Sequence, residues 1–137
     1  MVIGLSRGRK LRIRVFVFGF LAAILMLASR PATAQQWNEF YYHSGTNTRF
    51  YYDTSSVSRT GSTVLVRWTD SNLQGGVERL VYLAQVECGA RTIRSLQVDR
   101  FDAQSGAYIG TVDLRASDSP RSADPGTMAG YLLGRVC

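Results

Sequence analysis

Two cysteines, Cys88 and Cys137, constrain the fold of this chain more than any other feature. They are the only cysteines in the sequence, so each is the sole intramolecular partner of the other. No C-x-x-C spacing occurs and the chain holds one histidine, which disfavours a redox pair or a metal site. The pattern predicts a structural disulfide. It would close a loop of about 50 residues and stabilise the fold by roughly 4 kcal/mol through the entropy of the unfolded chain.

Disulfides persist outside the cytoplasm, and the start of the chain indicates export. Basic residues cluster between positions 7 and 14, an uncharged apolar run covers Val15–Ala28, and Ala32-Thr33-Ala34 matches a small-residue cleavage motif. This order is typical of a secretory signal peptide. The apolar run is shorter than the roughly 20 residues that span a bilayer, so a retained anchor is the weaker interpretation. We expect a protein of the periplasm or cell surface of a Gram-negative-type bacterium.

Cleavage is expected between Ala34 and Gln35, which divides the chain into a signal peptide, 1–34, and one domain, 35–137. Six of the 16 basic residues and none of the ten acidic residues lie in the signal peptide, so the domain holds ten of each. A nucleic-acid partner needs a basic surface, and the balanced charge of the domain argues against one.

Alternating apolar residues predict a sheet. Val77–Cys88 is apolar on both sides and is expected near the middle of the sheet. Residues 54–61 are rich in Ser and Thr and are expected to form a turn. The other expected strands are Trp37–Tyr42, Arg49–Asp53, Ser62–Thr69, Thr92–Phe101 and a strand with Tyr108, Gly110, Val112 and Leu114 on one face.

The end of the chain has helical spacing. Asp124 followed by Pro125 predicts the helix start. Met128 and Leu132 do not fit the predicted apolar face, and Gly130 is expected to approach the sheet closely. That apolar face comprises Gly126, Ala129, Gly130, Leu133, Val136 and Cys137.

Cys88 falls on the more apolar face of its strand, and Cys137 falls on the apolar face of the helix. A disulfide between them brings those faces together. The sequence therefore predicts an α+β fold: a single antiparallel sheet of five to six strands with a C-terminal helix tethered to one face by the disulfide.

The sequence also resembles the surface-adhesin protein E family. The residues that carry the resemblance are the run from Phe50 to Val57 with Trp68 after it, Glu87-Cys88 followed by arginines, and the ending from Pro125 to Cys137. The resemblance implies a helix tied to the concave side of an antiparallel sheet. It also implies a periplasmic or surface-exposed protein, family members that bind host matrix proteins such as vitronectin and laminin, and a homodimer.

No residues form a recognisable catalytic, cofactor or metal site, so we expect no enzymatic activity and no cofactor. His43 lacks an acidic or nucleophilic companion and is interpreted as an exposed loop residue. The run Asp53-Thr54-Ser55-Ser56 offers one carboxylate, too few for a cation site, and is expected to form an Asx-type turn.

The candidate interaction surface comprises Tyr41, Tyr42, Arg49 and Tyr51, because tyrosine and arginine are enriched at protein interfaces. Alternation sends about half of the neighbouring aromatic residues inward, so core packing explains part of this cluster. Two functions stay open. One is an adhesin-like binding protein that contacts host matrix proteins, and the other is a non-adhesive envelope module with a structural or assembly role.

Overall fold

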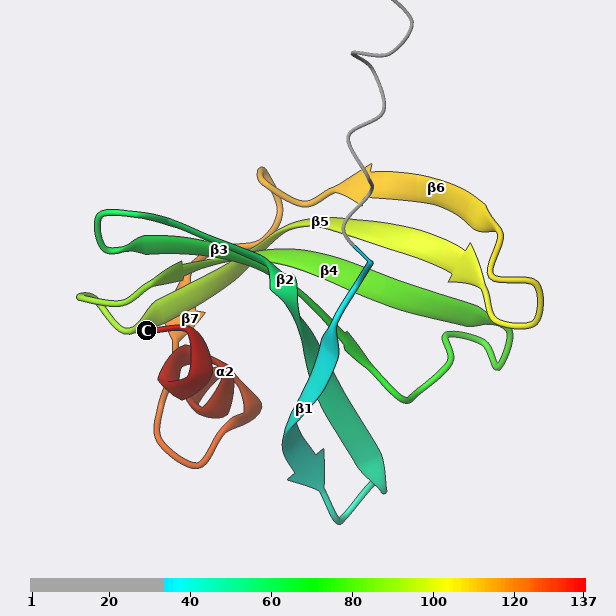
Figure 1. The fold of residues 1–137 in the computed structure, drawn as a ribbon, viewed down its shortest axis with the longest axis horizontal. Helices are drawn as coiled ribbons and strands as arrows, with labels where there is room; N and C mark the ends of the chain where they lie inside the picture. Colours follow the sequence, from blue (N-terminus) through cyan, green and yellow to red (C-terminus); the bar gives the residue numbers. More distant parts are fainter. Residues whose placement is uncertain (1–33) are drawn as a thin grey trace, which may run out of the picture. The chain divides into compact units, whose positions relative to one another are not determined.

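The computed structural model describes residues 34–137 and shows an antiparallel sheet with one helix on one side (Figure 1). The strands follow the chain in the order β1-β2-β3-β4-β5-β6, and β7 pairs with β5. The predicted α+β fold is confirmed, with β7 as an additional short strand. The signal-peptide prediction lies outside the described residues. The elements are β1 (Trp37–His43), β2 (Thr48–Thr60), β3 (Thr63–Asp70), β4 (Glu78–Glu87), β5 (Thr92–Asp102), β6 (Tyr108–Asp113), β7 (Arg121–Ser122) and α2 (Met128–Val136).

The core lies between the sheet and α2. Alternation on β3 sends Val64, Val66 and Trp68 to this side, as the sequence predicts, and all three are buried. Ala84 and Val86 of β4 lie beside them, opposite Val66 and Val64. β4 pairs with both β3 and β5, which confirms its predicted central place.

The predicted turn over residues 54–61 is wrong, because β2 continues to Thr60. The turn itself is shorter and centres on Gly61, whose φ of 61° suits a glycine. The Ser and Thr residues form an irregular stretch of the strand instead, where pairing with β3 shifts between Asp53 and Ser58. Ser56 stabilises this bulge, because its hydroxyl donates to the Asp53 carbonyl and accepts from the Arg67 N–H.

The helix begins later than predicted. Thr127 is the N-cap, and its Oγ1 accepts a hydrogen bond from the Gly130 N–H at 3.1 Å. Asp124 precedes the helix, and its carbonyl accepts hydrogen bonds from the Thr127 N–H and hydroxyl. Gly126 has a φ of 85°, which no right-handed helix contains. Gly126 therefore separates Asp124 from the helix, and Thr127 occupies the N-cap position.

The buried face of α2 is also displaced from the prediction. Leu132 was expected off the apolar face but is fully buried. The buried residues Ala129, Leu132, Leu133 and Val136 form a regular i, i+3, i+4, i+7 stripe. The predicted face included Gly126, which lies outside the helix. Counting Gly126 as helical shifted the predicted centre of the apolar face.

Cys88, directly after β4, forms the predicted disulfide with Cys137, and the two Cα atoms lie 5.6 Å apart. The Cys137 N–H donates to the Leu133 carbonyl and closes the last turn of α2. The Arg59 guanidinium donates to the carbonyls of Val136 and Cys137, which the helix leaves without partners. The disulfide and Arg59 together fix the C-terminal end of α2 to the sheet.

Candidate binding face

α2 packs on one face of the sheet (Figure 1), and we call the opposite face, which carries no helix of the described residues, the open face. Antiparallel pairing aligns one residue from each of five strands in a row. Their chain neighbours, such as Trp68 and Tyr82, pack on the helix side, so alternation places the row on the open face. The row consists of Tyr51, Thr69, Val81, Asp99 and Thr111.

Two of the predicted interaction residues meet at the β1–β2 end of the open face. The Arg49 guanidinium carbon lies 5.0 Å from the centroid of the Tyr42 ring, a cation–π distance. Glu39 holds the same arginine, with 2.8 Å between Arg49 Nη1 and Glu39 Oε2. This hydrogen bond and the charge of Glu39 raise the pKa of Arg49. Tyr42 is 43% exposed, so the pair presents an aromatic ring and a cation to solvent.

The other two predicted residues are separated by the sheet. Tyr51 lies on the open face and is half-buried. Tyr41 lies on the helix side, where its ring stacks on Tyr131 with centroids 5.0 Å apart. The cause is a bulge in β1: pairing shifts between Glu39 and Tyr41, so Phe40 and Tyr41 both face the core.

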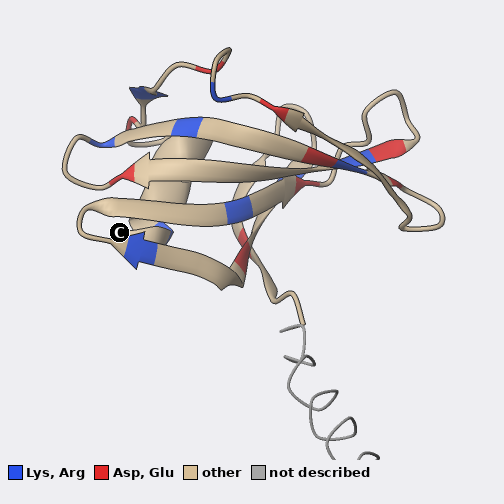
Figure 2. Ribbon diagram, turned by 90° about the horizontal axis from the view of Figure 1, so that it is seen from above, with Lys and Arg blue, Asp and Glu red and all other residues tan. Residues whose placement is uncertain are grey.

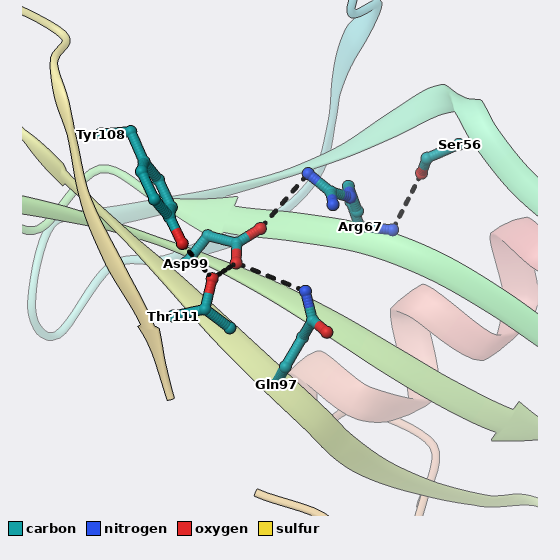
Figure 3. A network of polar contacts seen from close by, with 6 residues as sticks. All are labelled: Ser56, Arg67, Gln97, Asp99, Tyr108 and Thr111. Carbon is teal, nitrogen blue, oxygen red and sulfur yellow. Dashed lines mark hydrogen bonds and ion pairs between the residues drawn. The ribbon is translucent and has the colours of Figure 1, made fainter. Parts of the chain in front are cut away.

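A polar network farther along the open face joins three strands (Figure 3). Asp99 of β5 is its centre and is only 7% exposed. Thr111 of β6 donates to Asp99 Oδ1, as does the Gln97 amide at 3.3 Å, and Arg67 of β3 lies 3.4 Å from Oδ2. The Tyr108 hydroxyl lies 2.7 Å from Thr111 Oγ1. Protein groups contact both oxygens of Asp99, so the network fastens the edge strand β6 rather than offering a reactive carboxylate.

Sequence reasoning missed this network because its members come from separate strands and only the pairing register brings them together. Alternation places Arg67 on the side of β3 opposite Val66 and Trp68, where a charged side chain can face solvent without a partner. Its partner, Asp99, is reached only through two further pairings across β4.

His43 and Asp53, the residues considered for catalysis and cation binding, form hydrogen bonds with neighbouring groups of the fold. His43 ends β1, and its Nδ1 accepts a hydrogen bond from the Thr46 N–H at 3.2 Å. Asp53 accepts from the Gln36 N–H and from the N–H and hydroxyl of Ser55, the predicted Asx-type arrangement. Burial acts to raise the pKa of Asp53, but these hydrogen bonds outweigh it and lower the pKa. Within residues 34–137, no group of three His, Cys, Asp or Glu side chains could hold a metal ion.

Charged residues of both signs are spread over the strands and loops (Figure 2). Ion pairs join many of them, including Arg100 with Glu78 at 2.6 Å and Arg121 with Asp118 at 3.4 Å. Both signs are therefore mixed along the described chain rather than separated into regions of one sign.

No helix in the described part of the chain is both long and apolar enough to cross a membrane. No match to the chain was found among curated proteins or among solved structures. The family model for surface-adhesin protein E matches residues 37–137, from the start of β1 to the disulfide. The match includes every strand, the helix and both cysteines, and it confirms the resemblance seen in the sequence. The chain belongs to the surface-adhesin protein E family.

Proposed function

We propose that this protein is an exported binding protein, without enzymatic activity, that contacts a protein partner through the open face. Membership of the surface-adhesin protein E family supports a role in adhesion at the cell surface. The partner would be a host matrix protein in the adhesin role. We also propose that the signal peptide, residues 1–34, is removed after Ala34.

The observation that carries this proposal is the exposed pair of Tyr42 and Arg49. Glu39 orients the guanidinium against the ring, so little side-chain entropy is lost when a partner binds. Tyrosine and arginine contribute a large share of binding energy at protein interfaces. Because the pair lies away from α2, a partner could reach it without displacing the helix.

Binding to immobilised vitronectin and laminin at physiological salt tests the proposal. Saturable binding is expected, and Tyr42→Ser should weaken it by about tenfold or more, the loss typical of a central interface tyrosine. Tyr131→Ser is the matched control, because Tyr131 is a similarly exposed tyrosine, 48%, on the helix side. Equal losses in the two variants, or absence of saturable binding, would contradict adhesion through the open face.

Cell fractionation separates adhesion from the alternative envelope role. A surface-bound protein supports the adhesin role, whereas a strictly periplasmic protein would rule out direct contact with a host. Recovery of envelope components by pull-down would then favour the structural or assembly role. We also propose that the protein forms a homodimer, as the family resemblance implies, and light scattering on the purified protein tests this.

A further inference from the structure

The open face contains a cavity of about 520 Å³ at the end of the sheet where the β3–β4 and β5–β6 loops meet. Its volume is within the range of small-molecule sites. Three aromatic residues from three strands line it: Trp37 of β1, Tyr51 of β2 and Phe101 of β5. Val81 of β4 is buried between these strands and adds an apolar surface.

Arg79 lines this cavity, and its side chain forms no hydrogen bond or ion pair with the described residues. It pairs with Phe101 across β4 and β5, so both side chains lie on the open face. Asp70 also borders the cavity but pairs with Phe50, whose ring packs on the helix side. Asp102 borders it too, and its Oδ1 accepts hydrogen bonds from Gln104 and Ser105 within its own loop.

Arg79 differs from most arginines of the domain. Others donate to carboxylates, such as Arg67 to Asp99, or to amide and carbonyl oxygens, such as Arg94 to Gln85. Within residues 34–137, the side chains of Arg79 and Arg135 form no hydrogen bond or ion pair. Arg135 lies in the last turn of α2, where a cation is favourable beside the helix carbonyls. The position of Arg79 beside an aromatic cavity has no such explanation within the fold.

We propose that this cavity binds a carboxylate attached to an apolar body about the size of one aromatic ring. A guanidinium holds a carboxylate with two parallel hydrogen bonds, and the aromatic walls would enclose the apolar body. An inorganic anion would leave the aromatic walls unused. This site does not depend on the proposed adhesive function. The ligand is a free organic acid or the C-terminus of a peptide with an aromatic last residue.

Trp37 lines the cavity and can report ligand binding by NMR. The chain holds two tryptophans, Trp37 in the cavity and Trp68 in the helix-side core, so NMR separates their indole N–H signals. Titration of the purified, disulfide-bonded protein with 3-phenylpropionate should shift the Trp37 signal saturably and leave Trp68 in place. The uncharged 3-phenylpropionamide should bind about tenfold more weakly, because a charge-assisted hydrogen bond is lost.

Arg79→Gln should cause a similar loss of 3-phenylpropionate affinity, whereas Arg135→Gln, at the other unpartnered arginine, should bind as the unchanged protein does. The Arg79 side chain makes no polar contact within residues 34–137, so its replacement should leave the remaining NMR signals in place. A peptide ending in Phe with a free carboxylate, compared with its amidated form, tests the second source. The proposal would be overturned if the acid and the amide bound equally, or if Arg79→Gln and Arg135→Gln had equal effects. It would also be overturned if neither 3-phenylpropionate nor the peptide shifted the Trp37 signal.

Discussion

Gly130 and Gly134 lie one turn apart in α2, yet a methyl group would meet different surroundings at each. A Cβ on Gly130 would lie 2.1 Å from the Asp124 carbonyl oxygen, in the chain segment that leads into the helix. The predicted close approach of Gly130 to the sheet is wrong, because its close neighbour is this segment. A Cβ on Gly134 would meet nothing within 4 Å.

Replacement of these glycines by alanine should therefore change stability in opposite directions. Gly134→Ala should raise the free energy of unfolding by about 0.5 to 1 kcal/mol, because alanine favours the helix. Gly130→Ala should lower it by roughly 1 to 3 kcal/mol, because the entry segment must move. Urea denaturation of both variants measures this difference. A stabilising Gly130→Ala would mean that the segment before α2 yields easily.

The start of α2 supplies a test at the scale of a single element. Thr127→Ala removes the side chain that accepts from the Gly130 N–H and donates to the Asp124 carbonyl, and should cost about 1 kcal/mol of stability. Asp124→Ala should cost less, because the Asp124 side chain contacts Ser122 and caps no helical N–H. Thermal or urea unfolding ranks the two variants. The reverse order would restore Asp124 as the cap that the sequence suggested.

The edge strand β6 depends on the Asp99 network. Asp99→Asn should destabilise the protein by on the order of 1 to 3 kcal/mol, because Arg67 loses a charged partner and Thr111 a strong acceptor. Hydrogen exchange should accelerate most in β6. Asp113→Asn is the control, since Asp113 pairs with Arg115 where both side chains are more than half exposed, and it should change stability little. Equal exchange rates in the two variants would show that the network does not hold β6.

The strands and the disulfide were predictable because their signals are local or have one solution. Alternation identifies β3, and two cysteines allow one pairing. The irregular part of β2 was not predictable, because serine and threonine suit a turn and a bulge equally. The position of Tyr41 depended on the bulge in β1, which reverses the side that the next residue faces. The sequence pattern therefore did not reveal that the sheet divides the four candidate residues between its two faces.

At the scale of the whole molecule, the disulfide should account for much of the stability. Reduction, or replacement of both cysteines by serine, should lower the free energy of unfolding by about 4 kcal/mol. The strands retain their hydrogen bonds, so the largest local loss should occur in α2, which near-ultraviolet circular dichroism and hydrogen exchange can detect. An unchanged denaturation midpoint after verified reduction would show that packing and Arg59 hold the helix without the covalent bond.

Stability should also decrease in acid. Hydrogen bonds from Ser55 and Gln36 hold the pKa of Asp53 below its ordinary value despite burial, so protons bind the unfolded chain more readily. The stability that Asp53 contributes is therefore present above about pH 4, the ordinary Asp range, and is lost as pH falls below it. Asp53→Asn should make the decrease between pH 7 and pH 3 smaller in urea denaturation.

Asp70 provides a control of opposite sign. Burial raises its pKa, so the folded protein binds this proton more readily and gains stability from Asp70 as pH falls. Asp70→Asn removes that gain and should make the acid loss larger. If Asp53→Asn and Asp70→Asn changed the pH dependence of stability in the same direction, the hydrogen bonds to Asp53 would not be the cause of the acid loss.

The bond between Cys88 and Cys137 also determines how the domain would carry a mechanical load. A pull between Trp37 and Cys137 passes along the backbone to Cys88 and then crosses the disulfide. The segment between the cysteines, which contains β5, β6, β7 and α2, is then a closed branch that the pull cannot extend. Roughly 160 Å of chain is withheld, at about 3.4 Å for each of the 48 intervening residues. Under tension, the hairpins before Cys88 would unfold first. Reduction of the disulfide would release the segment between the cysteines, and the unfolded chain could then extend farther.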